Sequence, residues 1–273
     1  MRITVISFSP VGGTEQAARI FAAELAAHLT DAAGRAETEI RVVPYTLPHE
    51  RQELRFGPED VVVMASPVYA GRLPNKLMPE FKAKLFGDGT PAAALCTFGN
   101  RSCGEALREL VLLLEQNGFR PFAAAALAVE HVFSQKVGTG RPDAADLAEL
   151  KQFARAAAQK LAVSDFAPLG VDRGEIGPYY TPLKEDGTPA RFLKAKPRTD
   201  AALCDRCGRC AAVCPMGSID PQTLQTVGVC IKCQACLKAC PTGAKSFDDP
   251  DFLSHVAMLE QHYTRRAPNT FLL

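Results

Sequence analysis

The sequence has no charge bias, no long apolar run and no glycine motif of the dinucleotide-binding type. Its 31 Lys and Arg against 30 Asp and Glu give a formal net charge of +1, so the charge balance does not indicate binding to nucleic acid or to a membrane surface. No apolar run approaches the roughly 20 residues that a membrane-spanning helix needs. No G-x-G-x-x-G follows the first predicted strand, so direct use of a dinucleotide is not expected.

Cysteine is scarce outside one short region, and no leader pattern is evident. Residues 1–6 enter a strand pattern directly, without the basic and apolar regions of a cleavable signal. Of the 10 cysteines, only Cys96 and Cys103 lie outside residues 204–240, so no disulfide framework is expected. These features predict a protein of the reducing cytoplasm.

The cysteines of residues 204–240 form two runs with identical spacing. Each run reads C-x2-C-x2-C-x3-C-P, the bacterial ferredoxin pattern, in which the fourth cysteine ligates the other cluster when two runs are present. Two [4Fe-4S] clusters are therefore predicted. The first has the ligands Cys204, Cys207, Cys210 and Cys240, and the second has Cys230, Cys233, Cys236 and Cys214.

The alternative for these cysteines is a pair of zinc sites. Four-cysteine zinc sites usually join two C-x-x-C pairs from separate segments. A triplet of cysteines followed by Cys-Pro, occurring twice, fits that pattern poorly. The spacing therefore favours iron–sulfur clusters.

The first 163 residues alternate between short apolar runs and helical patterns. The predicted strands are residues 3–8, 38–43, 61–65, 92–97 and 122–129, and the predicted helices are residues 14–29, 76–86, 104–117 and 143–163. This alternation predicts an α/β fold with a doubly wound, five-stranded parallel sheet.

The first predicted strand ends in a loop that could hold an anion. The loop reads Ser9-Pro10-Val11-Gly12-Gly13-Thr14, and Thr14 is the predicted N-cap of the following helix, with Glu15 in its first turn. Free backbone N–H groups at a helix N-terminus bind phosphate well. The alternative is that Gly12 and Gly13 simply make a tight turn.

Three loops are expected to meet at one crevice. Ligands of doubly wound sheets bind beyond the carboxyl ends of the strands, where the strand order reverses. In the five-stranded flavodoxin-like order this point lies between the first and third strands. Loops 9–14 and 66–74 leave these two strands, and loop 98–102 leaves the neighbouring one.

Residues 1–163 resemble a flavodoxin, with Ser9 to Thr14 at the position of its phosphate loop, and residues 200–247 resemble a two-cluster bacterial ferredoxin. The combination resembles the flavodoxin–ferredoxin fusion proteins of anaerobic bacteria. The resemblance implies FMN as a third cofactor. Pro10 and Val11 stand where many flavodoxins have hydroxyl residues, which leaves Ser7, Ser9 and Thr14 as hydroxyl candidates.

The resemblance also implies a domain division. The expected parts are a flavodoxin-like FMN-binding domain at 1–163, a linker or arm at 164–199, a small α+β ferredoxin-like domain at 200–248, and a C-terminal helix and tail at 249–273. Phe252, Val256, Leu259 and Tyr263 form one helical face, which is expected to pack against the flavodoxin-like part.

The candidate FMN contacts lie in the three loops and at the ends of their strands. They are Ser7, Ser9, Pro10, Val11, Gly12, Gly13, Thr14, Ser66, Pro67, Val68, Tyr69, Ala70, Gly71, Arg72, Thr97, Phe98, Gly99, Asn100 and Arg101. Tyr69 either stacks on the flavin ring or packs on the sheet. Arg72 and Arg101 are either cations near the ring or solvated charges.

Other residues have no predicted site role. His131 is interpreted as a loop histidine farther from the crevice, and no catalytic residue is predicted. The proline- and lysine-rich stretch 168–197 is either a basic docking edge for an acidic redox partner or a solvated connector.

The sequence thus predicts an electron-transfer protein that passes electrons between two [4Fe-4S] clusters and FMN, with redox proteins as its partners. One alternative is an FMN-dependent reductase of a small organic substrate, supplied with electrons by the clusters. Another is a binding protein with structural or regulatory clusters and an empty flavodoxin-like unit.

Overall fold

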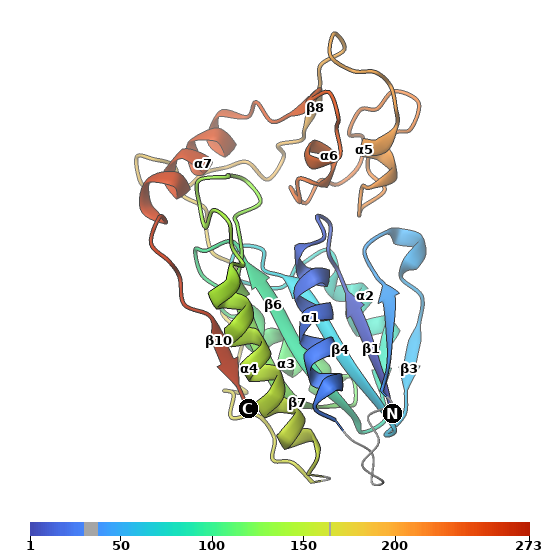
Figure 1. Cartoon of the computed structure of the whole chain (residues 1–273). Helices are drawn as coiled ribbons and strands as arrows, with labels where there is room; N and C mark the ends of the chain where they lie inside the picture. Colours follow the sequence, from blue (N-terminus) through green and yellow to red (C-terminus); the bar gives the residue numbers. More distant parts are fainter. Residues whose placement is uncertain (30–37, 164) are drawn as a thin grey trace.

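The computed structural model describes residues 1–29, 38–163 and 165–273. The chain forms a layered α/β unit and a smaller cysteine-rich unit, which lies beyond the carboxyl ends of the parallel strands (Figure 1). Residue 164, where the predicted arm begins, is outside the described residues. Among the described helices, none combines the length and the apolar character that crossing a membrane requires.

A six-stranded sheet in the order β10-β7-β6-β4-β1-β2 forms the centre of the α/β unit. Five of its strands are parallel and match the predicted ones. They are β1 Arg2–Ser7, β2 Glu39–Pro44, β4 Asp60–Pro67, β6 Thr90–Phe98 and β7 Phe119–Ala128. Numbered among themselves, these strands have the order 2-1-3-4-5 of flavodoxin-like sheets. The predicted fold class is therefore confirmed.

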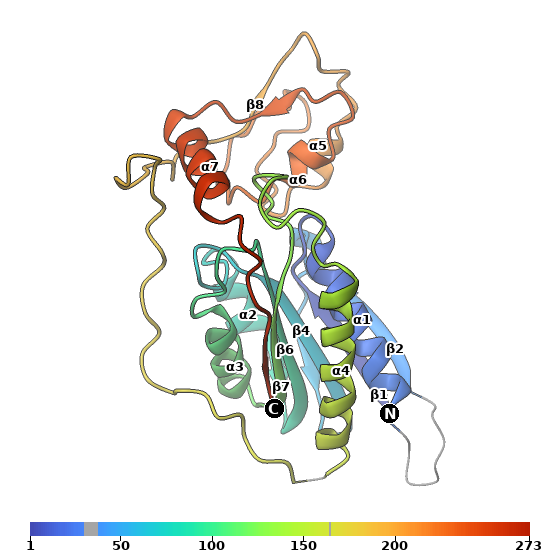
Figure 2. The same ribbon diagram turned by 60° about the vertical axis from the view of Figure 1, so that its left-hand side comes forward.

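Helices cover both faces of this sheet (Figure 2). They are α1 Gly13–Ala27, α2 Met78–Lys84, α3 Ala106–Gln116 and α4 Ala144–Leu161. One face packs on α1 and α4, where the ring centroids of Phe21 and Phe153 are 5.8 Å apart. The other face packs on α2 and α3. Because both faces are covered, the inner strands are apolar on both sides, as the continuous run Val61 to Ala65 illustrates, whereas the edge strand β2 is largely exposed.

Two short strands form a separate parallel pair that the sequence pattern did not reveal. β3 Leu54–Phe56 pairs with β5 Leu85–Gly87, and the 3-10 helix η1 Pro48–Glu50 precedes β3. The helix predicted for residues 76–86 therefore ends earlier, at Lys84. Leu85 and Phe86 continue its apolar pattern, but they belong to a strand because Leu54 and Arg55 pair with them.

A sixth strand, β10 Thr270–Leu272, joins the sheet beside β7 in the antiparallel direction. It lies in the segment predicted only as a helix and tail. The ring of Phe271 packs 4.9 Å from that of Phe153 on α4, so the tail closes one edge of the apolar core. A strand of three residues is too short to be recognised from alternation alone.

The cysteine-rich unit contains two short helices, α5 Arg209–Ala212 and α6 Ala235–Lys238. Each helix follows a residue in the left-handed conformation, Gly208 and Gln234, so the two cysteine runs are an internal repeat in structure as well as in sequence. An antiparallel pair, β8 Arg198–Thr199 and β9 Lys245–Ser246, closes the unit.

Helix α7 Pro250–His262 connects the two units. Its Phe252 packs against Phe133 in the loop after β7, with ring centroids 4.9 Å apart, and against Phe192 of the arm and Phe247 of the cysteine-rich unit. Leu259 packs with Val137, also in the loop after β7. The expected packing of this helix face against the flavodoxin-like part is confirmed.

Candidate functional site

The three predicted loops meet at the carboxyl end of the sheet. The hydroxyl groups of Thr14 and Thr97 are 2.7 Å apart and share a hydrogen bond. The amide of Val68 donates to the carbonyl oxygen of Thr97 at 2.8 Å. The amide of Glu105 donates to the carbonyl oxygen of Gly71 at 2.8 Å, which joins loop 66–74 to the segment after loop 98–102. Hydrogen bonds therefore join the three loop regions at this end of the sheet, where the sequence predicts the crevice.

The first loop ends at the N-terminus of α1, but its cap differs from the predicted one. Gly12, with φ 88°, is the N-cap, and the hydroxyl of Ser9 accepts a hydrogen bond of 3.0 Å from the amide of Glu15. Thr14 lies inside the helix, with its hydroxyl directed to Thr97. The prediction of Thr14 as the cap is wrong because glycine supplies the positive φ that the loop needs to enter the helix.

The same loop leaves backbone donors for an anion. Within the described residues, no hydrogen bond uses the amides of Val11, Gly13 or Thr14. A Cβ atom built on Gly12 or Gly13 meets nothing within 4 Å, so both glycines face open space. Three unused N–H groups at the positive end of a helix fit a phosphate group. Thr46 supports the loop, since its hydroxyl accepts a hydrogen bond of 2.8 Å from the amide of Ser9.

Loop 66–74 forms a tight hairpin turn around Tyr69. Tyr69 and Arg72 exchange backbone hydrogen bonds of 2.8 and 3.1 Å, with Ala70 and Gly71 at positive φ between them. Burial raises the pKa of Tyr69 well above its usual value, and the nearby thiols of Cys233 and Cys230 raise it further. Tyr69 packs on the same apolar cluster as Met216 and Ile231, which lie close in sequence to Cys214 and Cys230 of the second set.

The two arginines of these loops have different surroundings. Arg72 forms an ion pair with Glu109 at 2.6 Å, donates to the carbonyl oxygen of Gly177, and packs on the ring of Tyr179. These contacts favour a structural role for Arg72, which holds the arm against the α/β unit. The guanidinium of Arg101 instead stacks 3.8 Å from the ring centre of Tyr180, so it stays the candidate cation of the crevice.

The side chain of Asn100 forms hydrogen bonds with other segments of the chain. Its side chain is buried, donates to the carbonyl oxygens of Tyr263 and Arg265, and accepts from Arg141 and from the amide of Ala267. With both donors and its oxygen engaged, this side chain holds the segment after α7. Ser66, Thr97 and Phe98 are also buried. The exposed surface of loops 66–74 and 98–102 therefore comes chiefly from their other residues.

His131 lies closer to the crevice than expected. A Cβ atom on Gly99 would approach its ring to 2.5 Å, so His131 packs directly on loop 98–102 and requires glycine there. Burial, with His255 and Arg101 nearby, lowers the pKa of His131 to about 4, so the ring is neutral at pH 7. Its Nδ1 accepts a hydrogen bond of 3.2 Å from the amide of Phe133.

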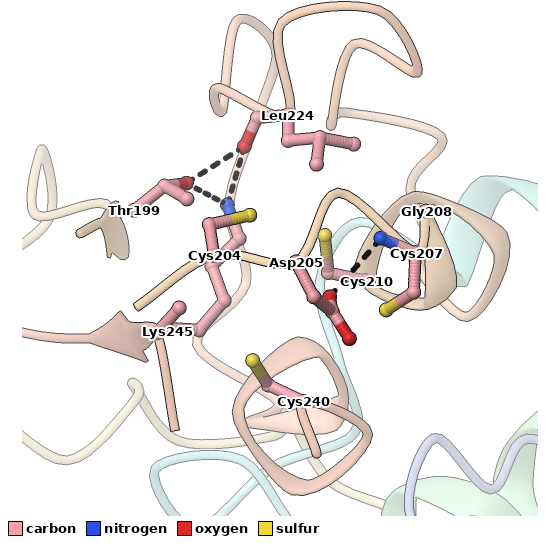
Figure 3. A pocket seen from close by; sticks show the side chains of 10 residues that line it. Thr199, Cys204, Asp205, Cys207, Gly208, Cys210, Leu224, Cys240 and Lys245 are labelled. Atoms are coloured by element: carbon pink, nitrogen blue, oxygen red, sulfur yellow. Dashed lines mark hydrogen bonds between the residues drawn. The ribbon is translucent and has the colours of Figure 1, made fainter. Parts of the chain in front are cut away.

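The eight cysteines line two hollows that match the two predicted ligand sets. Cys204, Cys207, Cys210 and Cys240 lie around the first (Figure 3). Cys214, Cys230, Cys233 and Cys236 line the second. In each hollow, three cysteines come from one run and the fourth from the other run. The structure therefore brings each crossed set together, and the ligand assignment stays a prediction.

The spacing of the thiols also bears on the zinc alternative. Zinc–sulfur bonds of about 2.3 Å in a tetrahedron place the sulfur atoms within about 4 Å of one another. In the part of the chain that the structure describes, no group of three or more His, Cys, Asp or Glu side chains is close enough to hold a single ion. The thiols are therefore spaced more widely than a single zinc ion requires.

The second hollow adjoins the α/β unit. Met216 and Ile231, which line this hollow, also pack against the apolar core of the α/β unit. Arg51, only 5% exposed, donates to the carbonyl oxygens of Thr46 and Pro215, and so links the loop after β2 to the Cys-Pro step of the first run. A lone arginine in a loop gave no sequence signal for this role.

Comparisons with known proteins agree with this division. Residues 196–219 and 228–243 each match a family model described as a 4Fe-4S binding domain. The chain thus joins a flavodoxin-like unit to two 4Fe-4S binding segments. No curated protein matches the sequence.

Similar solved structures include flavodoxins and a flavoenzyme. A flavodoxin from the domain Archaea is 17% identical, with a TM-score of 0.37 over 59% of this chain and 99% of that one. A two-electron reduced flavodoxin from Megasphaera elsdenii is 16% identical, with a TM-score of 0.34 over 57% and 98%. An FMN-dependent NADH-azoreductase from Bacillus anthracis, in complex with FMN, is 10% identical, with a TM-score of 0.36 over 59% and 100%. The fold assignment rests on the strand order, not on these values.

Proposed function

We propose that this protein transfers electrons between its two [4Fe-4S] clusters and an FMN bound at the crevice. The observation that carries the proposal is the packing of Met216 and Ile231, which line the second hollow, on the same apolar cluster as Tyr69 of loop 66–74. The hydrogen bond from Arg51 to the carbonyl oxygen of Pro215 supports the same arrangement. The second cluster is therefore the one that exchanges electrons with the flavin.

The residues of the crevice fit FMN. The unused amides of Val11, Gly13 and Thr14 would hold its phosphate, and the open space over Gly12 and Gly13 leaves room for it. Tyr69 would provide an apolar surface for the ring system, and Arg101 a positive charge near it. The strand order supports this placement, because ligands of such sheets bind at this edge.

The stoichiometry of the cofactors supports the proposed conversion. Each cluster carries one electron, whereas a flavin accepts two electrons with their charge-balancing protons. One electron from each of the two reduced clusters therefore reduces one FMN fully, and the reverse reaction reduces both clusters. The protein would connect a partner that exchanges single electrons with one that exchanges pairs.

The partners would be redox proteins in a reducing cytoplasm. Cysteine use supports that location, since thiolate-ligated clusters and unpaired thiols suit a reducing compartment. The first hollow is the better candidate for contact with a partner, because its Cys207 is exposed.

Rapid mixing tests the proposal. Anaerobically purified protein that holds iron and FMN would be fully reduced and then mixed with an oxidant specific for flavin. Cluster reoxidation should follow flavin reoxidation at a rate that is independent of protein concentration, because the transfer is intramolecular. A rate that rises with protein concentration would refute internal transfer. A visible spectrum without flavin bands would refute the FMN site.

A further inference from the structure

We propose that Lys245 is the buried counter-charge of the first cluster, the one predicted on Cys204, Cys207, Cys210 and Cys240, and that it raises the reduction potential of this cluster. The inference rests on the two-cluster part of the proposed function and is independent of the flavin.

Lys245 is fixed inside the cysteine-rich unit. It belongs to β9, its side chain is 4% exposed, and it lines the first hollow together with the four cysteines (Figure 3). Its ammonium group donates to the hydroxyl of Thr199 at 2.6 Å and to the carbonyl oxygen of Leu224 at 2.5 Å. Two hydrogen bonds from neighbouring segments hold the charge in one place.

Neither of these partners neutralises the ammonium group. Both are uncharged, and within the described residues no carboxylate forms an ion pair with Lys245. Asp205 lines the same hollow, but its Oδ1 accepts a hydrogen bond from the amide of Cys207. A buried charge without a counter-charge is strongly unfavourable. Since iron is bound by thiolates, the loaded hollow carries the negative charge that Lys245 otherwise lacks.

The position of the Lys245 charge affects the reduction potential of the first cluster. Reduction adds an electron to a cluster, so a fixed positive charge beside it stabilises the reduced state. Lys245 lines the first hollow, whereas the second hollow has a lysine of its own, the partly buried Lys232, whose ammonium group donates to the carbonyl oxygens of Leu193 and Cys230. Removing the charge of Lys245 is therefore expected to lower the reduction potential of the first cluster.

Three substitutions separate charge from structure. Lys245→Gln keeps hydrogen-bond donors but removes the charge, Lys245→Arg keeps the charge, and Thr199→Val removes an acceptor without touching the charge. Lys238→Gln is the matched control, because Lys238 is exposed and lies two residues before the ligand Cys240. Its charge is screened by solvent.

The measurement is an anaerobic redox titration followed by electron paramagnetic resonance, on protein with verified iron content. For Lys245→Gln we expect the ratio of reduced to oxidised first cluster at a fixed potential to fall about tenfold, which corresponds to about 59 mV for one electron. Lys245→Arg, Thr199→Val and Lys238→Gln should stay within about twofold of the parent protein.

The outcomes separate this inference from the proposed function. An unchanged potential in Lys245→Gln, or an equal fall in Thr199→Val, with full iron content, would overturn the counter-charge alone. Parent protein without two clusters would overturn the proposed function as well. If Lys245→Gln does not fold, the Arg and Val variants decide: a tenfold fall in either one contradicts the inference.

Discussion

The guanidinium group of Arg51 donates a hydrogen bond to the carbonyl oxygen of Pro215, although 164 residues separate them. Pro215 follows Cys214, a predicted ligand of the second cluster, and Arg51 follows η1 in the loop after β2. Nearby, a Cβ atom on Gly217 would lie 3.7 Å from the ring of Pro48. These contacts fix the second cysteine set against the crevice end of the sheet.

Replacing Arg51 with Met should loosen this contact. Hydrogen bonds from a charged group contribute about 1.5–3 kcal/mol, so the docked state should weaken by about that amount. Hydrogen exchange should become faster in residues 44–51 and 214–217, with unchanged iron content. Arg55→Met is the control, because Arg55 is exposed and paired with Glu53. Equal exchange in both variants would mean that Arg51 does not hold the units together.

The crossed ligation can be tested at Cys240. Cys240→Ser should damage the cluster that includes Cys204, Cys207 and Cys210, because the hollow around those residues contains Cys240. The other cluster should persist at one per chain, measured by iron content and electron paramagnetic resonance. Damage confined to the cluster of the neighbouring cysteines would contradict the crossed assignment.

The phosphate site can be tested at Gly13. This residue has ordinary helical φ and open space around its Cβ position, so both Gly13→Ala and Gly13→Asp should fold. An aspartate in the first turn also suits the helix dipole. Its charge should repel phosphate, so FMN affinity should fall at least about tenfold while riboflavin affinity changes little. Equal losses for both ligands, measured by fluorescence titration, would place the phosphate elsewhere.

The lowered pKa of His131 should make the folding stability depend on pH in a specific way. Its pKa is about 4 in the folded protein, whereas an unfolded chain has a histidine pKa near 6.5, so the unfolded state binds the proton first. The stability that this residue contributes is present above about pH 6.5 and is lost as pH falls toward 4, at up to about 1.4 kcal/mol per pH unit. Denaturant unfolding between pH 5 and 7 should show a flatter profile for His131→Gln. The exposed His49→Gln should behave like the parent.

The sequence was sufficient for the fold wherever local pattern and burial agree. The strands β1, β4, β6 and β7 are largely buried on both faces, which is typical of a parallel sheet covered by helices, whereas the edge strand β2 is largely exposed. The cysteine runs are equally informative, because cluster ligation constrains spacing directly. Short strands were missed, since β3, β5 and β10 exist only through partners distant in the chain.

The crevice side chains were harder to predict for a related reason. A polar residue in a loop after a strand can serve a ligand or the chain's own backbone. Asn100 and Arg72 serve the chain, through carbonyl oxygens more than 100 residues away. Lys245 shows the converse: nothing in the local pattern indicated that a lysine beside the second run would be buried.

Strand β10 changes what kind of attachment the cysteine-rich unit has. The arm after α4 stays on the α/β unit through Phe166, Leu169 and Tyr179, and the chain returns to this unit at Thr270–Leu272, so the cluster-bearing segment is fastened at both of its ends. A unit that is attached at one end only can adopt many orientations, whereas a unit that is attached at both ends can adopt few. Detaching β10 from β7 would free the C-terminal attachment of the cysteine-rich unit. The electron path would then depend on the arm and on side-chain contacts such as Arg51 to Pro215 and Phe252 to Phe133, even with every cofactor contact intact.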